Sequence, residues 1–377
     1  MGDYLGKDIP KLGFGLMRLP KLADGKNIDI EETKRMVDAF LAAGMKYFDT
    51  AYVYDGGLSE KAAKEALVDR YPRESFYLAT KLNTGAQGCV DEETAKKQLF
   101  TSLERTGAGY FDFYLLHALG TRNRQSYEDY HLWDFVKEMK EKGLIRHYGF
   151  SFHDKPEVLD DLLTKHPDAE FVQLQINYAD WDAPNVQSRE CLEVARKHGK
   201  SVTVMEPVKG GTLAVPPERV QQIFRAADPV ASFPSWAIRF VASQDGIITV
   251  LSGMSNLAQM EDNLSYMKDF KPLNEEEMGV IRAAQAALAN VNSIPCTSCH
   301  YCTPGCPMQI PIPEIFGAMN KYLVYDQLEG AKQDYGWQTG GKSQASACIQ
   351  CGQCEQACPQ HIGIIEKLKE CAALLEA

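Results

Sequence analysis

Short apolar runs alternate with longer amphipathic segments along most of the chain. The apolar runs predict buried strands, and the amphipathic segments predict helices. The predicted strands cover residues 11–20, 47–48, 76–80, 111–116, 145–151, 171–178, 202–205 and 247–251. The predicted helices between them cover residues 30–44, 59–69, 91–105, 130–143, 157–165 and 184–199. Asp29 and Ser59 suit the starts of the first two helices, because short polar side chains accept hydrogen bonds from unpaired N–H groups.

This alternation predicts an α/β fold in which parallel strands are joined by helical crossovers. Eight strands within about 260 residues fit a closed barrel better than an open sheet. We therefore expect residues 1–272 to form a (β/α)8 barrel, the TIM barrel. Residues 273–291 are expected to form a connecting helix, because the glutamates at its start suit the positive end of a helix dipole.

The spacing of cysteines changes the picture after residue 291. Two runs have the form Cys-x2-Cys-x2-Cys-x3-Cys-Pro. The first run contains Cys296, Cys299, Cys302 and Cys306, and the second contains Cys348, Cys351, Cys354 and Cys358. This spacing is typical of bacterial ferredoxins, and it groups thiols as metal ligands rather than as disulfide partners. Zinc sites usually take their ligands in two pairs instead.

We therefore expect two [4Fe–4S] clusters in residues 292–377. A helical pattern over residues 313–325 favours a small helical ferredoxin-like domain. In two-cluster ferredoxins the fourth cysteine of each run ligates the other cluster. That rule assigns Cys358 to the cluster of the first run and Cys306 to the cluster of the second. The remaining cysteines are expected to be packed or surface thiols, namely Cys89, Cys191 and Cys371.

Composition and charge restrict the location and the partners of the protein. Hydrophobic residues make up 45% of the chain and charged residues 24%, as in ordinary globular proteins. The formal net charge of −11, without a basic stripe, argues against a nucleic-acid partner. We find neither an apolar run long enough to span a membrane nor a secretory signal, so we expect a cytoplasmic protein with no membrane partner.

Ionisable side chains follow three successive predicted strands. Asp49, Lys81 and His117 each stand at the end of one strand, and Tyr54 lies in the loop after Asp49. In a parallel barrel the C-terminal ends of the strands form the face where active sites are built. The structural alternative is an internal Asp49–Lys81 ion pair, with Tyr54 and His117 as bystanders.

These four residues, in this order, match the catalytic tetrad of the aldo-keto reductases. The segment 48–54, Phe-Asp-Thr-Ala-Tyr-Val-Tyr, resembles the signature of that superfamily. The resemblance covers about residues 10–270 and implies NAD(P)-dependent interconversion of a carbonyl and an alcohol, with Tyr54 as the general acid. A phenol has a pKa of about 10, so we expect the ammonium of Lys81 to lower the pKa of Tyr54. Asp49 would hold Lys81 in place, and His117 would orient the substrate oxygen.

The resemblance also implies contacts with a nicotinamide dinucleotide. Leu16, Met17 and Met205 would lie beside the nicotinamide ring, and Ser151 and Gln175 would bind its carboxamide. Pro207, Val208 and Gly210 match the end of the seventh strand and the loop expected over the pyrophosphate.

Residues 252–256 open the last helix of the predicted barrel, where Gly253 and Ser255 suit a phosphate group. A plain helix cap by Ser255 is the alternative. Asn263 matches an adenine contact of the family. Gln259 stands where many NADP-dependent relatives have an arginine, so the choice between NAD and NADP is open.

The whole chain resembles the bacterial aldo-keto reductases that carry a C-terminal ferredoxin-type domain. This resemblance favours an oxidoreductase that acts on a small-molecule carbonyl or alcohol and allows a redox partner protein. Two alternatives use the same sequence differently. In one, the protein is an iron–sulfur electron carrier with the barrel as a docking platform. In the other, the barrel senses nicotinamide and the clusters sense oxygen.

Overall fold

The computed structural model describes residues 4–184, 186–291, 293–296, 298, 300–358 and 360–377. The chain forms two compact units, and neither is one continuous stretch of sequence. The first unit contains Met1–Gly210 and Pro234–Met278, and the second contains Gly211–Phe233 and Gly279–Ala377. Residues 211–233 therefore belong with the C-terminal residues, whereas the sequence pattern placed them in a barrel domain ending at residue 272.

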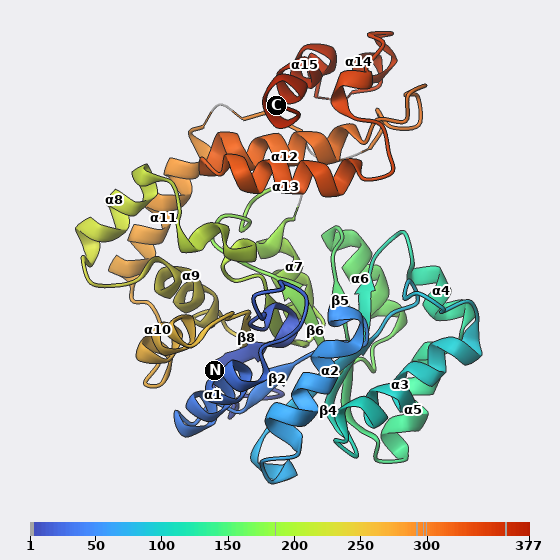
Figure 1. Ribbon diagram of the computed structural model, residues 1–377, viewed down its shortest axis with the longest axis vertical. Coiled ribbons are helices and arrows are strands. Elements are labelled where there is room, and N and C mark those ends of the chain that lie inside the picture. The colour runs from blue at the N-terminus through green and yellow to red at the C-terminus, as the bar shows by residue number, and fades with distance from the viewer. Residues whose placement is uncertain (1–3, 185, 292, 297, 299, 359) are drawn as a thin grey trace. The chain divides into compact units, whose positions relative to one another are not determined.

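Eight parallel strands of the first unit close into a barrel in the order β1 to β8 (Figure 1). The strands are β1 (Leu12–Gly15), β2 (Tyr47–Asp49), β3 (Tyr77–Leu82), β4 (Phe111–Leu119), β5 (Ile145–Phe152), β6 (Phe171–Gln175), β7 (Ser201–Met205) and β8 (Ile247–Ser252). Each overlaps a predicted strand, and β1 pairs with β8 to complete the ring. The prediction of a (β/α)8 barrel is confirmed.

Helices lie around these strands (Figure 1). They are α1 (Ile30–Ala42), α2 (Leu58–Ala63), α3 (Glu92–Thr106), α4 (Arg124–Asp129), α5 (Leu132–Glu141), α6 (Pro156–Lys165), α7 (Ser188–Lys197), α9 (Phe233–Ala242) and α10 (Leu257–Met267). Short 3-10 helices follow three of the strands: η1 (Leu16–Arg18), η2 (Tyr54–Gly57) and η5 (Lys209–Ala214). Asp29 caps α1 as predicted, because its side chain accepts a hydrogen bond from the N–H of Glu32.

Two predicted boundaries are wrong for local reasons. Ser59 does not cap α2 but lies inside it, because the helix already begins after Gly57, whose φ is +91°. The Ser59 hydroxyl is fully buried and donates to a backbone carbonyl of η1 at 2.9 Å. Strand β6 ends at Gln175, before the predicted end, because the side chain of Asn177 accepts the N–H of Asp180 at 2.8 Å and starts a turn.

Aromatic side chains from three strands pack inside the barrel. The ring centroid of Phe113 lies 5.0 Å from that of Tyr47 and 5.2 Å from that of Phe171, and all three residues are buried. Gly149 on β5 makes room for this packing, since a Cβ there would lie 2.2 Å from the carbonyl oxygen of Phe171. The barrel interior is therefore a filled core, so we look for a binding or active site in the loops at the strand ends.

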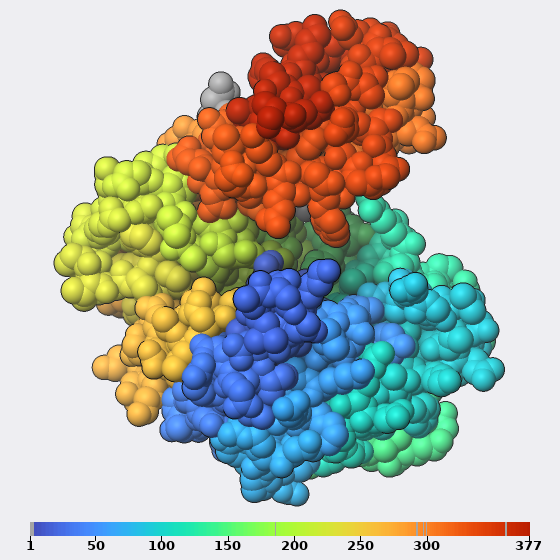
Figure 2. Space-filling view, viewed as in Figure 1, coloured from blue at the N-terminus to red at the C-terminus, as the bar shows by residue number. Residues whose placement is uncertain are grey.

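The second unit is helical, and its C-terminal residues gather into one compact body, coloured orange to red in Figure 2. Its helices are α8 (Glu218–Ala227), α11 (Glu275–Ala289, shared with the first unit), α12 (Ile312–Tyr325), α13 (Leu328–Thr339), α14 (Gln353–Gln356) and α15 (Ile364–Leu375). Arg219 of α8 ties residues 211–233 to this unit, because it donates to the carbonyls of Ala287 at 3.2 Å and of Val324. The prediction of a small helical C-terminal domain is confirmed. Within the described residues, no helix is both long and apolar enough to cross a membrane.

Candidate functional site

The four predicted catalytic residues come together at the C-terminal ends of β2, β3 and β4. Asp49 ends β2, Tyr54 begins η2 in the next loop, Lys81 lies on β3 and His117 lies on β4. The Nζ atom of Lys81 lies 2.5 Å from Oδ1 of Asp49 and 3.3 Å from the hydroxyl of Tyr54. The rings of Tyr54 and His117 meet edge to face, with centroids 5.8 Å apart. The strand ends thus place an acid–base set on one face of the barrel.

Lys81 is fully buried and fully satisfied by hydrogen bonds. Besides Asp49 and Tyr54 it donates to the carbonyl of Thr50 at 2.7 Å. Gln173 from the opposite side of the barrel donates to the second oxygen of Asp49 at 3.2 Å. Burial alone would lower the pKa of Lys81, but the carboxylate of Asp49 and the hydroxyl of Tyr54 outweigh it and raise that pKa. Lys81 therefore remains an ammonium group at neutral pH.

The pKa of Tyr54 is raised, whereas the sequence analysis expected Lys81 to lower it. Burial raises the pKa of the Tyr54 hydroxyl above 10.0, and the opposing effect of Lys81 is smaller than the effect of burial. The charge of Asp49 adds to the rise. Tyr54 consequently holds its proton at neutral pH, which is the state that a proton donor needs.

His117 is neutral and has a defined orientation. Burial lowers the pKa of His117 well below 6.5, and the nearby ammonium of Lys81 lowers it further. The amide Nδ2 of Asn83 lies 3.5 Å from Nδ1 of the imidazole. The orientation of this amide is fixed, because its oxygen accepts the N–H of Gly85 at 2.7 Å. Nδ1 is therefore the acceptor and Nε2 carries the hydrogen.

Asn83 was missed by the sequence analysis, although it stands two residues after Lys81 and just beyond the same strand. Its backbone is held at both ends by Gln98 of α3. The Asn83 N–H donates to the Gln98 side chain at 3.0 Å, and the Gln98 amide donates to the Asn83 carbonyl at 3.0 Å. Polar residues placed just after a catalytic strand residue are the signal that could have found it.

The predicted nicotinamide contacts follow β1, β5, β6 and β7. Leu16 is buried and Met17 is 57% exposed. Ser151 is fully buried, and its Oγ accepts the N–H of Ala118 at 2.6 Å. Gln175 and Met205 are partners in the register of β6 and β7, so their side chains belong to neighbouring strand ends.

A buried carboxylate behind Gln175 was not predicted. Asp180 accepts hydrogen bonds from Gln175 at 2.9 Å and from Asn177 at 2.8 Å, and its other oxygen lies 2.5 Å from Nζ of Lys209. These donors lower the pKa of Asp180 in spite of its burial. The network fixes the side chains of Gln175 and Lys209. Lys209 lies between two expected cofactor contacts, Val208 and Gly210, and the third, Pro207, is buried.

At the start of α10, side chains of the same segment already accept hydrogen bonds from two backbone N–H groups. Asn256, not Ser255, caps the helix by accepting the N–H of Gln259 at 2.9 Å. The Gln259 side chain accepts the N–H of Ser255 at 2.7 Å. Asn263 is buried and donates to the hydroxyl of Ser252 at 2.7 Å, so its amide is engaged inside the protein.

Most of the predicted cluster ligands line two cavities of the second unit. One cavity is lined by Cys296, Cys302 and Cys358, and the other by Cys306, Cys348, Cys351 and Cys354. Cys299 lies outside the described residues. The fourth cysteine of each run thus faces the cavity of the other run. Every cysteine that the structure describes is free of disulfide bonds.

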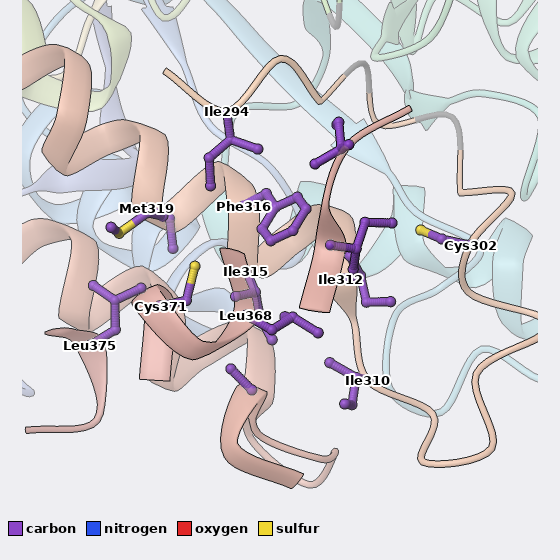
Figure 3. Close-up of a cluster of buried hydrophobic side chains, with 14 of the residues drawn as sticks. Ile294, Cys302, Ile310, Ile312, Ile315, Phe316, Met319, Leu368, Cys371 and Leu375 are labelled. Carbon is purple, nitrogen blue, oxygen red and sulfur yellow. The ribbon is translucent and has the colours of Figure 1, made fainter. Parts of the chain in front are cut away.

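The cysteines outside the two runs lie elsewhere. Figure 3 shows Cys371 within the apolar core of the second unit, beside Ile315 and Met319 and apart from Cys302. Burial raises the pKa of the Cys371 thiol to about 12, and that of Cys191 to about 12 as well. Both are therefore packed thiols, as predicted.

Comparison with known proteins agrees with this architecture. The aldo/keto reductase family matches residues 11–286, which is most of the chain. The chain belongs to the aldo/keto reductase family. A 4Fe-4S dicluster domain matches residues 295–362 of the second unit. This family member is 26% identical to the uncharacterized oxidoreductase YqkF of Bacillus subtilis, over 73% of this chain and 92% of that protein.

Solved structures of aldo-keto reductases have the same barrel. The holo form of AKR11C1 from Bacillus halodurans is 26% identical, with a TM-score of 0.59 over 75% of this chain and 95% of that one. An aldo-keto reductase from Klebsiella pneumoniae in complex with NADPH is 19% identical, with a TM-score of 0.58 over 74% of this chain and 92% of that one. The second likeness shows the fold alone.

Proposed function

We propose that this aldo/keto reductase interconverts a carbonyl and an alcohol with a nicotinamide dinucleotide, and that Tyr54 is its general acid and base. The observation that carries the proposal is the position of the Lys81 ammonium, between the carboxylate of Asp49 and the hydroxyl of Tyr54. A core ion pair would not need a half-buried tyrosine whose hydroxyl lies beside the lysine, nor a neutral histidine against the tyrosine ring.

The residues at the strand ends fit a nicotinamide dinucleotide. Gly210 and Gly253 leave the loops after β7 and β8 without side chains at two exposed positions, so a pyrophosphate can approach the backbone there. Gln175 offers an amide for the carboxamide, and Met205 offers an apolar surface for the ring. The Ser151 hydroxyl is fully buried and accepts the N–H of Ala118, so it would have to become exposed to bind the carboxamide. When bound in its reduced form, the nicotinamide supplies a hydride to the carbonyl carbon.

The side chains of the tetrad handle the proton. Tyr54 donates its hydroxyl proton to the carbonyl oxygen of the substrate. Lys81, at 3.3 Å, stabilises the phenolate that remains, and Asp49 keeps Lys81 charged and in place. His117 donates Nε2–H to the same substrate oxygen and orients it, since Nδ1 faces Asn83. In the direction of alcohol oxidation, Tyr54 takes the proton back.

The proposal is tested by a screen of aldehydes, ketones and alcohols with NADH and NADPH under anaerobic conditions. We expect turnover of at least a generic aldehyde, also by protein from which the clusters have been removed. Binding of nicotinamide without turnover of any carbonyl or alcohol would contradict the proposal and favour the sensor alternative.

We further propose that the second unit holds two [4Fe–4S] clusters with exchanged fourth ligands. The two thiol-lined cavities support this arrangement, because Cys358 joins Cys296 and Cys302, while Cys306 joins the second run. Cysteine thiols around a shared cavity are the ligands that a [4Fe–4S] cluster takes.

One observation favours electron transfer by this unit in addition to a structural role. Ile312 lines both cavities, so the two groups of ligands lie in neighbouring cavities that share this aliphatic residue. Clusters held at these positions would be close enough to exchange single electrons. Reduction of both clusters by one equivalent each of a chemical reductant, followed by electron paramagnetic resonance, would test this: magnetic coupling between them is expected, and two isolated signals would contradict it.

A further inference from the structure

Arg18 spans two loops of the barrel that are far apart in the sequence. It ends η1, directly after β1. Its Cδ, Cβ and Cγ atoms lie 3.4, 3.5 and 3.6 Å from the position that a Cβ of Gly253 would occupy. Its Nη2 atom lies 3.5 Å from the corresponding position at Gly210. The arginine therefore crosses the end of β8 and reaches the loop after β7.

A hydrogen bond to the backbone of Arg18 fixes the position of its main chain. The hydroxyl of Ser255 donates to the Arg18 carbonyl at 2.8 Å, which ties η1 to the loop after β8. Any larger residue at Gly253 would meet the aliphatic part of the arginine. The backbone of Arg18 is thus fixed, and the aliphatic part of its side chain lies along Gly253.

The guanidinium group of Arg18 makes no hydrogen bond or ion pair with the residues that the structure describes. Other arginines of the barrel differ in this respect. Arg73 and Arg146 both bind the buried carboxylate of Asp112, at 2.6 and 3.0 Å, and Arg105 binds that of Glu60 at 3.1 Å. Arg18 is exposed and therefore presents a planar set of N–H donors beside Gly210 and Gly253, with no acceptor among the described residues.

We propose that Arg18 binds the pyrophosphate of the nicotinamide dinucleotide and positions it between Gly210 and Gly253. This inference rests on the proposed function and adds a residue to it. A guanidinium matches two phosphate oxygens with two parallel hydrogen bonds. A chain with a net charge of −11 repels an anionic dinucleotide at long range, so a local cation is needed to hold it.

The pyrophosphate fits this position better than a carboxylate of the substrate does. Arg18 contacts the loops after β7 and β8, whereas Asp49, Lys81 and His117 lie on β2, β3 and β4. The substrate oxygen must reach Tyr54, next to β2. An anion at Arg18 therefore belongs to the part of the cofactor that extends away from the reacting carbon.

The test is calorimetric titration of the purified full-length protein with ADP-ribose, which carries the pyrophosphate, and with adenosine, which has no phosphate. We expect Arg18→Met to weaken ADP-ribose binding by about 10- to 100-fold, as for loss of a charge-assisted hydrogen-bonded pair. Adenosine binding should not change, and Arg18→Lys should recover part of the loss. Arg124→Met is the matched control, because Arg124 pairs with Asp161 on the barrel surface.

Other results of the titration would overturn the inference. Equal ADP-ribose affinity in Arg18→Met and in the unaltered protein would overturn the inference. Parallel losses for ADP-ribose and adenosine would also overturn it, because they would indicate a structural role. A raised KM for carboxylated aldehydes alone would assign Arg18 to the substrate instead. Failure of the unaltered protein to bind ADP-ribose at all would refute the proposed function, and the inference with it.

Discussion

At the scale of single residues, the acid strength of Tyr54 is set by two opposing effects. Burial favours the neutral phenol, and the ammonium of Lys81 favours the phenolate. In the protein alone burial is the larger effect, so the hydroxyl keeps its proton. In the proposed mechanism Lys81 still acts at the moment of transfer, because it lies 3.3 Å from the oxygen on which negative charge would develop.

Removal of the Tyr54 hydroxyl is the direct test of this role. We expect Tyr54→Phe to lower kcat for carbonyl reduction by about 10²- to 10⁴-fold, the usual contribution of a positioned proton donor. Binding of NADH or NADPH, followed by fluorescence titration, should hardly change. Tyr130→Phe is the control, since the Tyr130 hydroxyl makes only an exposed bond to the carbonyl of Val90. Full activity of Tyr54→Phe would refute the mechanism.

The shifted pKa values also predict the pH dependence of reduction. The pKa of Tyr54 is raised above 10.0 and that of His117 is lowered well below 6.5. Tyr54 therefore carries its proton below pH 10.0, and His117 is neutral above pH 6.5. We expect kcat/KM to be flat between these values and to fall at higher pH, as Tyr54 loses its proton. Initial rates across this range would check it, and an alkaline fall centred at about pH 8 would show that Lys81 outweighs burial.

The start of α10 predicts the choice of cofactor. The Gln259 side chain already binds the N–H of Ser255, and the carboxylate of Glu32 accepts the N–H of Leu257 at 2.9 Å. A 2′-phosphate would meet a carboxylate here and would lack the arginine of NADP-dependent relatives. We expect kcat/KM for NADH to equal or exceed that for NADPH, and Gln259→Arg to shift the ratio toward NADPH by about tenfold. Strong NADPH preference in the unaltered protein would mean that another residue reads the phosphate.

At the scale of secondary structure elements, the sequence predicts strands better than it predicts their ends. The buried runs identify all eight strands, and with them Asp49, Lys81 and His117, because an ionisable residue after an apolar run is a local signal. Ser59 does not act as the predicted helix cap, since its hydroxyl bonds to a carbonyl that is 43 residues away in the chain. Asn83 and Arg18 were missed for the same reason, because their roles depend on contacts between different strands.

The lack of a side chain at Gly149 lets strands β5 and β6 pack closely together. A Cβ at this residue would lie 2.2 Å from the carbonyl oxygen of Phe171 on the neighbouring strand, so β5 and β6 would have to separate. We expect Gly149→Ala to lower the free energy of unfolding by about 1–3 kcal/mol, as overpacked cores do, measured by urea denaturation. Gly15→Ala is the control, because its nearest atom would be Ser252 O at an ordinary 3.5 Å. Equal stability of the two variants would contradict this packing argument.

At the scale of the whole molecule, the chain passes between the two units three times, at residues 210–211, 233–234 and 278–279. The segment 211–233 joins two barrel strands yet packs on the second unit through Arg219 and through Thr212, whose carbonyl accepts a hydrogen bond from Gln327 at 3.1 Å. The family match that ends at residue 286 therefore does not mark a clean structural boundary. The loop that carries Gly210 continues directly into the unit with the cysteine runs.

The proposed exchange of fourth ligands can be tested by mutation of Cys358. The Cys358 side chain faces the cavity of Cys296 and Cys302, so we expect Cys358→Ala to affect the cluster of the first run and leave the second. Iron content, measured anaerobically, should fall by about half. Cys371→Ala is the matched control, because that thiol is fully buried in the apolar core and lines neither cavity.

The same variant separates a structural role of the clusters from a catalytic one. A cross-ligated cluster closes a loop of about 55 residues, worth roughly 3.5 kcal/mol of chain entropy. Loss of Cys358 should therefore loosen the second unit, while NAD(P)H-dependent carbonyl turnover, which needs only the tetrad and the cofactor face, should largely survive. If turnover is lost while circular dichroism shows an intact barrel and nicotinamide still binds, the clusters take part in the reaction. In that case single electrons, and not a hydride alone, must pass through this protein.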